Sequence, residues 1–220
     1  MKHLERDMEK LRSQIVRLGG MVEKATVNAI KTLETFDLSI VDEIHRDEAL
    51  INEMEVELEE ECLKTLALHQ PVAIDLRFLI VILKVNNDLE RMGDQVVNIA
   101  ERIAFLADKE RVTIDLDFAT MGGICTVMLH NALEALINQD VVVARKVLEM
   151  DDELNALHAR TYRNLQEEMV RNPQIIVPAV SCLTISSNLE RIGDLATNIA
   201  EEIIFMEEGE VVRHQEIALI

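Results

Sequence analysis

The amino-acid sequence predicts an all-α protein made of two tandem, homologous three-helix bundles, with six long antiparallel helices in total. Three observations predict this fold class. Leu, Ile, Val, Ala, Met and Glu dominate the composition, while the 220 residues include only three prolines, seven glycines and six aromatic residues. Apolar residues recur at spacings of three and four, which is the period of an amphipathic helix. One long motif occurs twice.

The duplicated motif divides the chain into two halves. LERMGDQVVNIAE at residues 89–101 returns as LERIGDLATNIAE at residues 189–201, shifted by 100 positions, and the shift becomes 103 further upstream. Each half, of about 110 residues, is within the size range of a small domain. We therefore expect one three-helix bundle in residues 1–110 and a second in residues 111–220.

Three helices are expected in the first half. The first runs from near the N-terminus to Phe36, and Asp37 then stands where the N-cap of the second helix belongs. Pro71 marks the next break, and the third helix is expected over residues 72–107. The apolar face of the first helix is formed by Leu11, Ile15, Leu18, Val22, Ala25 and Ala29.

The second half repeats this organisation. Asp115 or Asp117 opens its first helix, Asp140 caps its second and Pro173 opens its third. A helix of 30 residues is about 45 Å long at a rise of 1.5 Å per residue. Long helices joined by short connections pack as antiparallel bundles.

The charge of the chain narrows the classes of partner. Its 41 acidic and 22 basic residues give a formal charge of −19, which repels nucleic-acid phosphates and anionic lipids. We therefore expect no nucleic-acid partner, and membrane contact only through other proteins. The first residues lack a signal peptide, and the longest apolar run, 78–83, is far shorter than the roughly 20 residues that a bilayer requires. The sequence predicts a soluble, cytoplasmic protein.

The three cysteines support the same compartment. Cys62, Cys125 and Cys182 are widely separated and form no C-x-x-C motif. We interpret them as small core residues in a reducing cytosol.

A stripe of carboxylates and carboxamides is expected opposite the apolar face of the third helix in each half. At about 100° per residue, the residues of one stripe fall within an arc of about 80°. The two stripes are Glu90, Asp94, Asn98 and Glu101 in the first half, and Glu190, Asp194, Asn198 and Glu201 in the second. The apolar faces opposite them are formed by Val85, Leu89, Met92, Val96, Ile99 and Ile103, and by Leu189, Ile192, Ile199 and Ile203. Like charges at positions i and i+4 repel each other, so the stripes are either solvated surface or cation sites.

The second helix of each half favours the cation sites. By the same helical arithmetic, oxygen-bearing residues align as Glu48, Asn52, Glu55 and Glu59 in the first half, and as Asp151 and Asn155, followed by His158, in the second. If the two helices of a half lie side by side, four or more oxygen ligands come together. Such ligands without cysteine suit iron, manganese, magnesium or calcium better than a structural zinc ion.

Several classes of enzyme lack support in the sequence. No Glu-x-x-His or H-E-x-x-H motif is present, which disfavours a ferritin-like oxidase. No P-loop, G-x-G-x-x-G or G-x-S-x-G motif is present, so nucleotide binding and serine catalysis have no basis. Gly93 and Gly193 either allow close helix packing or clear space beside a metal face. The pairs Gly19-Gly20 and Gly122-Gly123 either let another backbone approach or bend the helix that contains them.

The motifs resemble those of a known family. Leu-Gly-Gly at 18–20, Met-Gly-Gly at 121–123, Gln-Pro-Val-Ala-Ile-Asp-Leu-Arg at 70–77 and the two copies of Leu-Glu-Arg-(Met/Ile)-Gly-Asp are similar to those of the PhoU family, bacterial regulators of phosphate uptake. The resemblance covers nearly the whole chain. It implies a cytosolic, non-enzymatic regulator that forms a homodimer and links the phosphate ABC transporter to a histidine kinase. It also implies that the phosphate-starvation response is repressed when phosphate is plentiful.

The resemblance also implies metal binding. The family's motif of an acidic residue followed by Asp four positions later is complete at Glu90/Asp94 and at Glu190/Asp194. On the second helix of each half, Asn52 and Asn155 stand where the motif has its Asp, after Glu48 and Asp151 respectively. Each replacement removes one anion, so the affinity and the number of metal ions at these places are open.

Two other classes of function stay open beside the metal-binding adaptor. A metal-dependent phosphoester hydrolase is conceivable because bound metal ions activate water, although a convex helix face offers little concavity for a substrate. A purely structural helical scaffold would bind no metal.

Overall fold

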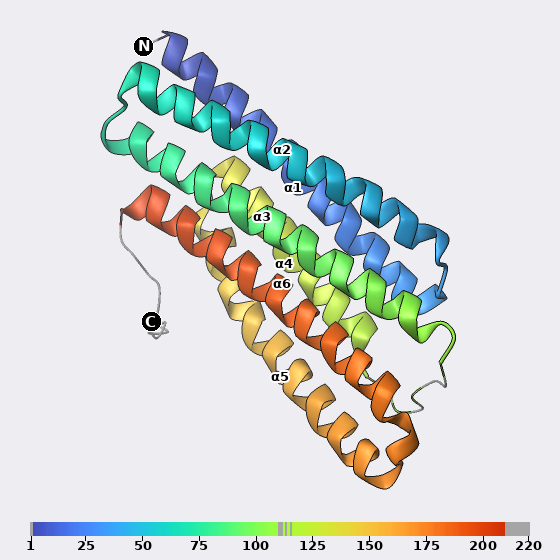
Figure 1. The fold of residues 1–220 in the computed structure, drawn as a ribbon. Coiled ribbons are helices and arrows are strands. Elements are labelled where there is room, and N and C mark those ends of the chain that lie inside the picture. The colour runs from blue at the N-terminus through green and yellow to red at the C-terminus, as the bar shows by residue number, and fades with distance from the viewer. Residues whose placement is uncertain (1, 110–111, 113, 115, 210–220) are drawn as a thin grey trace.

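The protein is described by a computed structural model, which covers all residues except 1, 110–111, 113, 115 and 210–220. Within the described residues the chain forms six α-helices, a short 3-10 helix and no strand (Figure 1). The elements are α1 Lys2–Thr35, α2 Ser39–His69, α3 Ala73–Leu106, α4 Phe118–Asn138, α5 Val141–Arg171, η1 Pro173–Ile175 and α6 Ile176–Glu208. The predicted all-α fold of two similar three-helix units is confirmed.

Local sequence signals explain most helix ends. Asp140 caps α5 as expected, because its side chain accepts hydrogen bonds from the backbone N–H groups of Val142 and Val143. Asp37 lies one residue before the cap position, and its carboxylate accepts from the backbone N–H of Ser39 at 3.0 Å. Pro173 opens the 3-10 turn η1, so α6 begins three residues later than the sequence indicates.

Of the two residues predicted to open the first helix of the second half, Asp117 lies directly before α4. Asp117 precedes α4 in a left-handed conformation and makes no cap hydrogen bond, but it forms an ion pair with Arg160 of α5. Asp115 and the predicted domain boundary between residues 110 and 111 lie outside the described residues. The boundary therefore stays a prediction.

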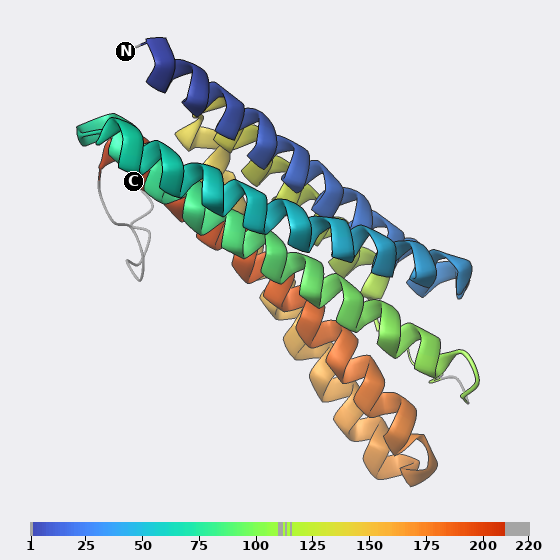
Figure 2. The ribbon, with the colours of Figure 1, turned by 45° about the horizontal axis from the view of Figure 1, so that its top comes forward.

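The two halves share one core. In both views α3 and α6 lie side by side through the middle of the molecule, with α1 and α2 on one side and α5 on the other (Figures 1 and 2). The residues that the sequence assigns to the apolar faces of α1, α3 and α6 are buried, and they belong to one continuous cluster that includes both halves. Burial of this apolar surface is the main stabilising contribution to folding.

The helices α1 and α4 join the halves on the other side of the core. A Cβ atom added to Gly19 of α1 would collide with the side chain of Leu133 on α4, and one added to Gly122 of α4 would collide with Ile30 on α1. The two contacts are related by the internal duplication. Of the two interpretations left open for these glycines, the structure supports close approach of the helices.

The three cysteines are buried and unpaired, as expected for core residues. Burial raises the pKa of the Cys62 thiol to about 12 and that of Cys182 to about 11.

Two segments are long and apolar enough to cross a membrane by length and composition alone, residues 118–138 and 173–208. About half of the apolar window in each is buried inside the bundle, at 50% and 56%, which is also how core helices of a soluble bundle behave. This criterion is weak evidence for a membrane span.

Candidate metal centre

The first carboxylate cluster lies where α2 packs against α3. We define it as Glu48, Asn52, Glu55, Glu90 and Asp94. Burial raises the pKa of Asp94, and the carboxylate of Glu48 across the helix interface raises it further. The structure therefore brings together side chains that are 46 residues apart in the sequence.

Glu90 links the two sides of this cluster. Burial raises its pKa, followed by the negative charges of Asp94, Glu55 and Glu48, while Arg91 acts in the opposite direction. Glu55 also has a raised pKa, first because of burial and then because of Glu59. These partly buried carboxylates repel one another. A bound cation would therefore reduce the electrostatic repulsion that is present in the metal-free protein.

Asn52 holds the α2 side of the cluster. Its Nδ2 donates to Glu48 Oε1 at 3.0 Å, which fixes the orientation of the amide. Its Oδ1 is buried and has no hydrogen-bond partner. A buried oxygen acceptor beside several carboxylates fits a cation better than a further anion.

The second carboxylate cluster lies between α5 and α6. We define it as Asp151, Asn155, His158, Glu190 and Asp194. Burial, and next the carboxylate of Asp194, raise the pKa of Asp151 to about 6, against the lowering effect of a hydrogen bond from Asn155. That bond joins Asn155 Nδ2 to Asp151 Oδ2 at 2.8 Å, and the other oxygen, Asp151 Oδ1, is buried without a partner.

His158 makes the second cluster different from the first. Burial raises the pKa of Glu190 and of Asp194, and His158 lowers both. Its Nδ1 lies 2.9 Å from the hydroxyl of Ser186, which fixes the orientation of the ring. By the offset of 103 residues, His158 takes the place that Glu55 has in the first half.

The helix glycines beside the two clusters have different surroundings. A Cβ on Gly193 would collide with Leu154 and would lie 3.5 Å from Asp151 Oδ1, so this glycine both admits α5 and clears space beside the carboxylate. A Cβ on Gly93 would lie 3.4 Å from the side chain of Ile51. At Gly93 the structure supports only the helix-packing interpretation.

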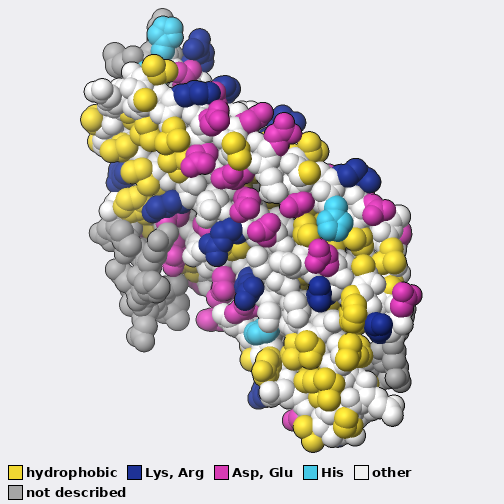
Figure 3. All heavy atoms as spheres, viewed as in Figure 1, with side chains coloured by type: hydrophobic (Ala, Val, Ile, Leu, Met, Phe, Trp, Pro, Cys, Tyr) yellow, Lys and Arg dark blue, Asp and Glu magenta, His cyan; other side chains and the backbone are white. Residues whose placement is uncertain are grey.

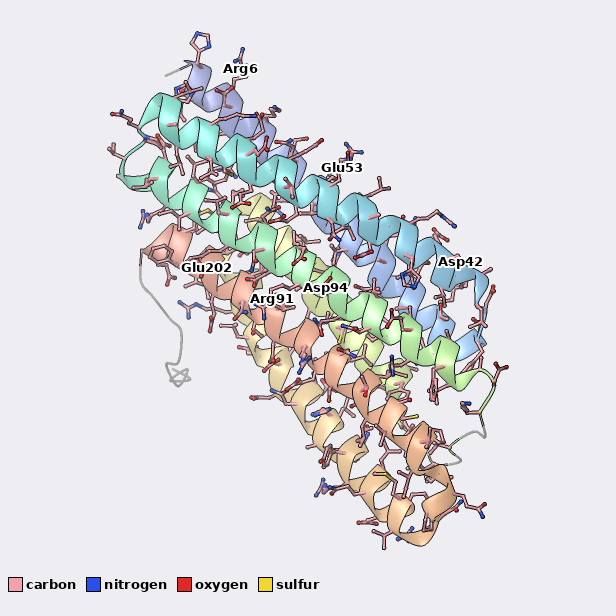
Figure 4. All side chains as sticks on the ribbon, in the orientation of Figure 1. Arg6, Asp42, Glu53, Arg91, Asp94 and Glu202 are labelled. Carbon is pink, nitrogen blue, oxygen red and sulfur yellow. The ribbon has the colours of Figure 1, made fainter. Side chains whose placement is uncertain are left out.

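Four predicted site residues lie further along their helices. Glu101 is near Arg102, with a carboxylate to guanidinium distance of 3.8 Å, and Asn98 is exposed. Asn198 and Glu201 line a groove of about 570 Å³ between α3 and α6, opposite Lys84 and Arg91. Figure 4 shows Arg91 and Asp94 near the middle of α3. The prediction that these residues share one side of their helix was correct. Asp194 and Glu201 are nevertheless seven residues apart, which is about 10 Å along the helix axis, so they do not belong to one site.

In the described part of the chain, no three His, Cys, Asp or Glu side chains converge closely enough to hold one metal ion together. The carboxylates of each cluster are instead too far from one another to share one ion. Each cluster also contains one buried oxygen that accepts no hydrogen bond, Asn52 Oδ1 in the first and Asp151 Oδ1 in the second. The chemistry of the donors fits a hard cation, and ligation would require the carboxylate side chains to change rotamer.

Sequence reasoning missed the buried residues behind the clusters. Asn86 is almost fully buried, and its Nδ2 donates to the backbone oxygen of Glu55 at 2.9 Å. Its counterpart Ser186, also buried, contacts His158. The sequence did contain a signal for these two residues, because a polar residue stands at the same position of the apolar face in both repeats.

Comparisons with known proteins were consistent with one another. A family model described as "PhoU domain" matches the chain twice, at residues 15–103 and 118–203. A phosphate-specific transport system accessory protein PhoU homolog from Aquifex aeolicus is 33% identical over 214 residues, which is 97% of each chain. A homolog of the same name from Deinococcus radiodurans is 34% identical over 206 residues, covering 94% of this chain and 97% of the relative.

Solved structures agree with the sequence matches. The crystal structure of PhoU from Pseudomonas aeruginosa has a TM-score of 0.91 and 31% sequence identity, covering 94% of this chain and 99% of that one. PhoU from Streptococcus pneumoniae, a phosphate transport system regulatory protein, has a TM-score of 0.87 and 27% identity, covering 95% and 99%. The duplicated helices, the family match to both halves and these relatives show that the chain belongs to the PhoU family of phosphate transport accessory and regulatory proteins.

Proposed function

We propose that this protein is a cytoplasmic, metal-binding adaptor that represses the phosphate-starvation response when phosphate is plentiful. It would link the ATPase subunit of the phosphate ABC transporter to a phosphate-sensing histidine kinase and modulate phosphate uptake, acting as a homodimer and without catalytic activity of its own. The family and the names of the relatives support the phosphate part of this proposal. The two carboxylate clusters support the metal part.

The observation that carries metal binding is one buried, partnerless oxygen in each cluster, Asn52 Oδ1 of the amide in the first half and Asp151 Oδ1 of the carboxylate in the second. They occupy the two halves at positions that each face carboxylates of the neighbouring helix. Glu48, Glu90 and Asp94 would join Asn52 in holding a divalent or trivalent ion, and Glu190 and Asp194 would join Asp151. Iron, manganese and magnesium all accept such oxygen ligands, and the bound ion would supply a local positive charge.

An adaptor role agrees with the position of the clusters. Their carboxylates lie along helix–helix seams at the surface, whereas the two apolar cavities are lined by other residues. A partner that distinguishes the metal-bound from the metal-free surface would couple metal or phosphate to signalling. The partner must bind the two states with different affinities, because a ligand that binds both states equally does not shift the equilibrium between them.

Metal analysis tests the proposal directly. Protein purified without a chelator is compared with Asp94→Ala plus Asp194→Ala, and with Asp42→Ala plus Glu153→Ala as a control for the loss of two exposed carboxylates. We expect the first variant alone to lose metal. Equal metal content in all three samples would show that the clusters are only surface.

Genetics tests the regulatory part. Deletion of the gene is expected to leave phosphate-starvation genes expressed even in high phosphate, and the double Asp→Ala variant is expected to reproduce part of that effect. Full repression in the deletion strain would contradict the regulatory role.

A further inference from the structure

The exposed face formed by α3 and α6 has an internal two-fold relationship. The helices run antiparallel, since Lys84 Nζ lies 2.9 Å from Glu202 Oε2 and Gly209 approaches Arg77. The same register places Gly93 level with Gly193. Because the sequence repeats with a shift of 100 residues along these helices, each feature of α3 has a counterpart at the opposite end of α6.

Each end of this face carries an apolar patch. The α3 patch is Leu76 and Ile80, each 37% exposed, and the α6 patch is Ile176 and Val180, which are 45% and 51% exposed. The two members of each patch are four residues apart and therefore lie on one side of their helix. Figure 3 shows apolar side chains gathered at both ends of this view, with charged side chains between them.

The middle of the face is acidic. Residues 84–102 and 184–202 together carry eight carboxylates and four basic side chains, a formal charge of −4. Lys84 and Arg91 contribute to the polar groove between the helices, and each is already paired with a carboxylate, Glu202 and Asp88 respectively. The net charge favours a partner with basic groups at the corresponding place.

We propose that this face binds a homodimeric protein whose two-fold axis coincides with the internal two-fold of the face. One chain of the present protein would then contact both subunits of the partner. Each subunit would place apolar side chains on one patch and basic side chains toward the middle. This inference rests on the adaptor function proposed above and adds the symmetry and the chemistry of the partner.

The repetition of the patches is the basis of the symmetry. A two-fold partner presents the same surface twice, so it is matched by a surface that itself occurs twice around one axis. In the part of the chain that the structure describes, both patches are exposed rather than packed in the core. Exposed apolar groups rimmed by polar residues are typical of protein-binding surfaces.

Charge argues against two other occupants of the face. A second copy of this chain would bring one acidic middle against another, and an anionic bilayer would meet the same repulsion. A homodimeric partner with basic groups between two apolar contacts avoids both costs.

Stoichiometry and paired variants test the proposal. The probes are the purified ATPase subunit of the phosphate transporter and the full-length histidine kinase in nanodiscs, both from the same genome. We expect one chain of this protein for every two partner subunits, measured by sedimentation or mass photometry. Ile80→Asp and Val180→Asp are each expected to weaken binding about tenfold, and the two together about a hundredfold.

A matched control is Val127→Asp, since the side chain of Val127 is 48% exposed. Val127 belongs to α4, and this helix lies behind α3 and α6 in Figure 1. This variant is expected to leave binding unchanged. The milder variants Ile80→Ala and Val180→Ala keep helix propensity, so a weakening shared by the Ala and Asp variants does not depend on unfolding.

Three results would overturn the symmetric docking. They are one chain for each partner subunit, loss of binding from only one of the two patches, and binding of the patches to a second copy or to anionic vesicles instead. Absence of binding to either probe would remove the adaptor function itself, and the inference with it.

Discussion

Asn155 Nδ2 donates to Asp151 Oδ2 at 2.8 Å, one helical turn apart on α5, and so leaves the buried Asp151 Oδ1 as an acceptor without a donor. Asn52 makes the equivalent bond to Glu48 on α2 at 3.0 Å. In both halves an amide therefore orients a carboxylate beside the acidic side chains of the next helix. The same amide stands where the family's motif has the carboxylate of an Asp. The repulsion among the acidic side chains of the metal-free protein is therefore lower than it would be with that Asp.

Replacing these amides by carboxylates is expected to strengthen metal binding. Asn52→Asp and Asn155→Asp each add one anionic ligand, so we expect the affinity for Mn²⁺ to rise about tenfold at each cluster. Each substitution should make the metal-free protein less stable by about 0.2–0.5 kcal/mol, because like charges four residues apart repel. Isothermal titration and urea unfolding in chelator measure the two effects.

Asn164→Asp is the matched control, since Asn164 is exposed on the same helix as Asn155. It is expected to change neither affinity nor stability by a comparable amount. Unchanged affinity in both cluster variants would show that α2 and α5 do not contribute ligands.

The raised pKa of Asp151 predicts that the metal-free protein loses stability as the pH rises. Between the ordinary value of 3.8 and about 6, the folded state keeps a proton that the unfolded state has released. Stability therefore falls through this window and stays lower above it. Because the carboxyl is only half-buried, we expect a loss of about 1 kcal/mol from this group.

Urea unfolding in chelator at pH 4.5 and pH 7 measures this dependence. Asp151→Asn is expected to reduce the pH dependence and to be more stable than the wild type at pH 7. Glu153→Gln, an exposed neighbour on α5, should leave the dependence intact. Equal pH dependence in the wild type and Asp151→Asn would contradict the raised pKa.

The glycine pairs predict opposite effects for adjacent positions. Gly19→Val and Gly122→Val are expected to destabilise the protein by about 1–3 kcal/mol, because each side chain would force α1 and α4 apart. Gly20→Ala and Gly123→Ala have open space around the new Cβ and are expected to stabilise by about 0.5–1 kcal/mol. Thermal unfolding of the four variants is the measurement, and the same sign at adjacent positions would contradict the close helix contact.

Much of the fold was predictable because helical periodicity is a local property. The apolar positions chosen from spacing, such as Leu89 and Ile99 on α3, are fully buried. The partner of each helix was not predictable in this way. Periodicity shows which face of α3 is apolar, but the packing of α3 against α6 and of α1 against α4 depends on contacts between residues about 100 positions apart.

The site was predictable in composition but less so in position. Helical angles correctly placed Glu90 and Asp94 toward Glu48, yet they ignore distance along the axis, so Asn198 and Glu201 were grouped with Asp194 although they face α3. The buried Asn86 behind the first cluster was missed because a single polar residue within an apolar face gives no periodic signal.

The affinity of the protein for the transporter ATPase subunit or the kinase, measured with and without Mn²⁺ or Fe²⁺, tests the metal-dependent adaptor most directly. We expect the wild type to bind at least about tenfold more tightly with metal, and Asp94→Ala plus Asp194→Ala to show no difference while remaining folded, since both positions lie off the core face. Equal affinity of the wild type with and without metal, matched by the variant, would contradict the proposal.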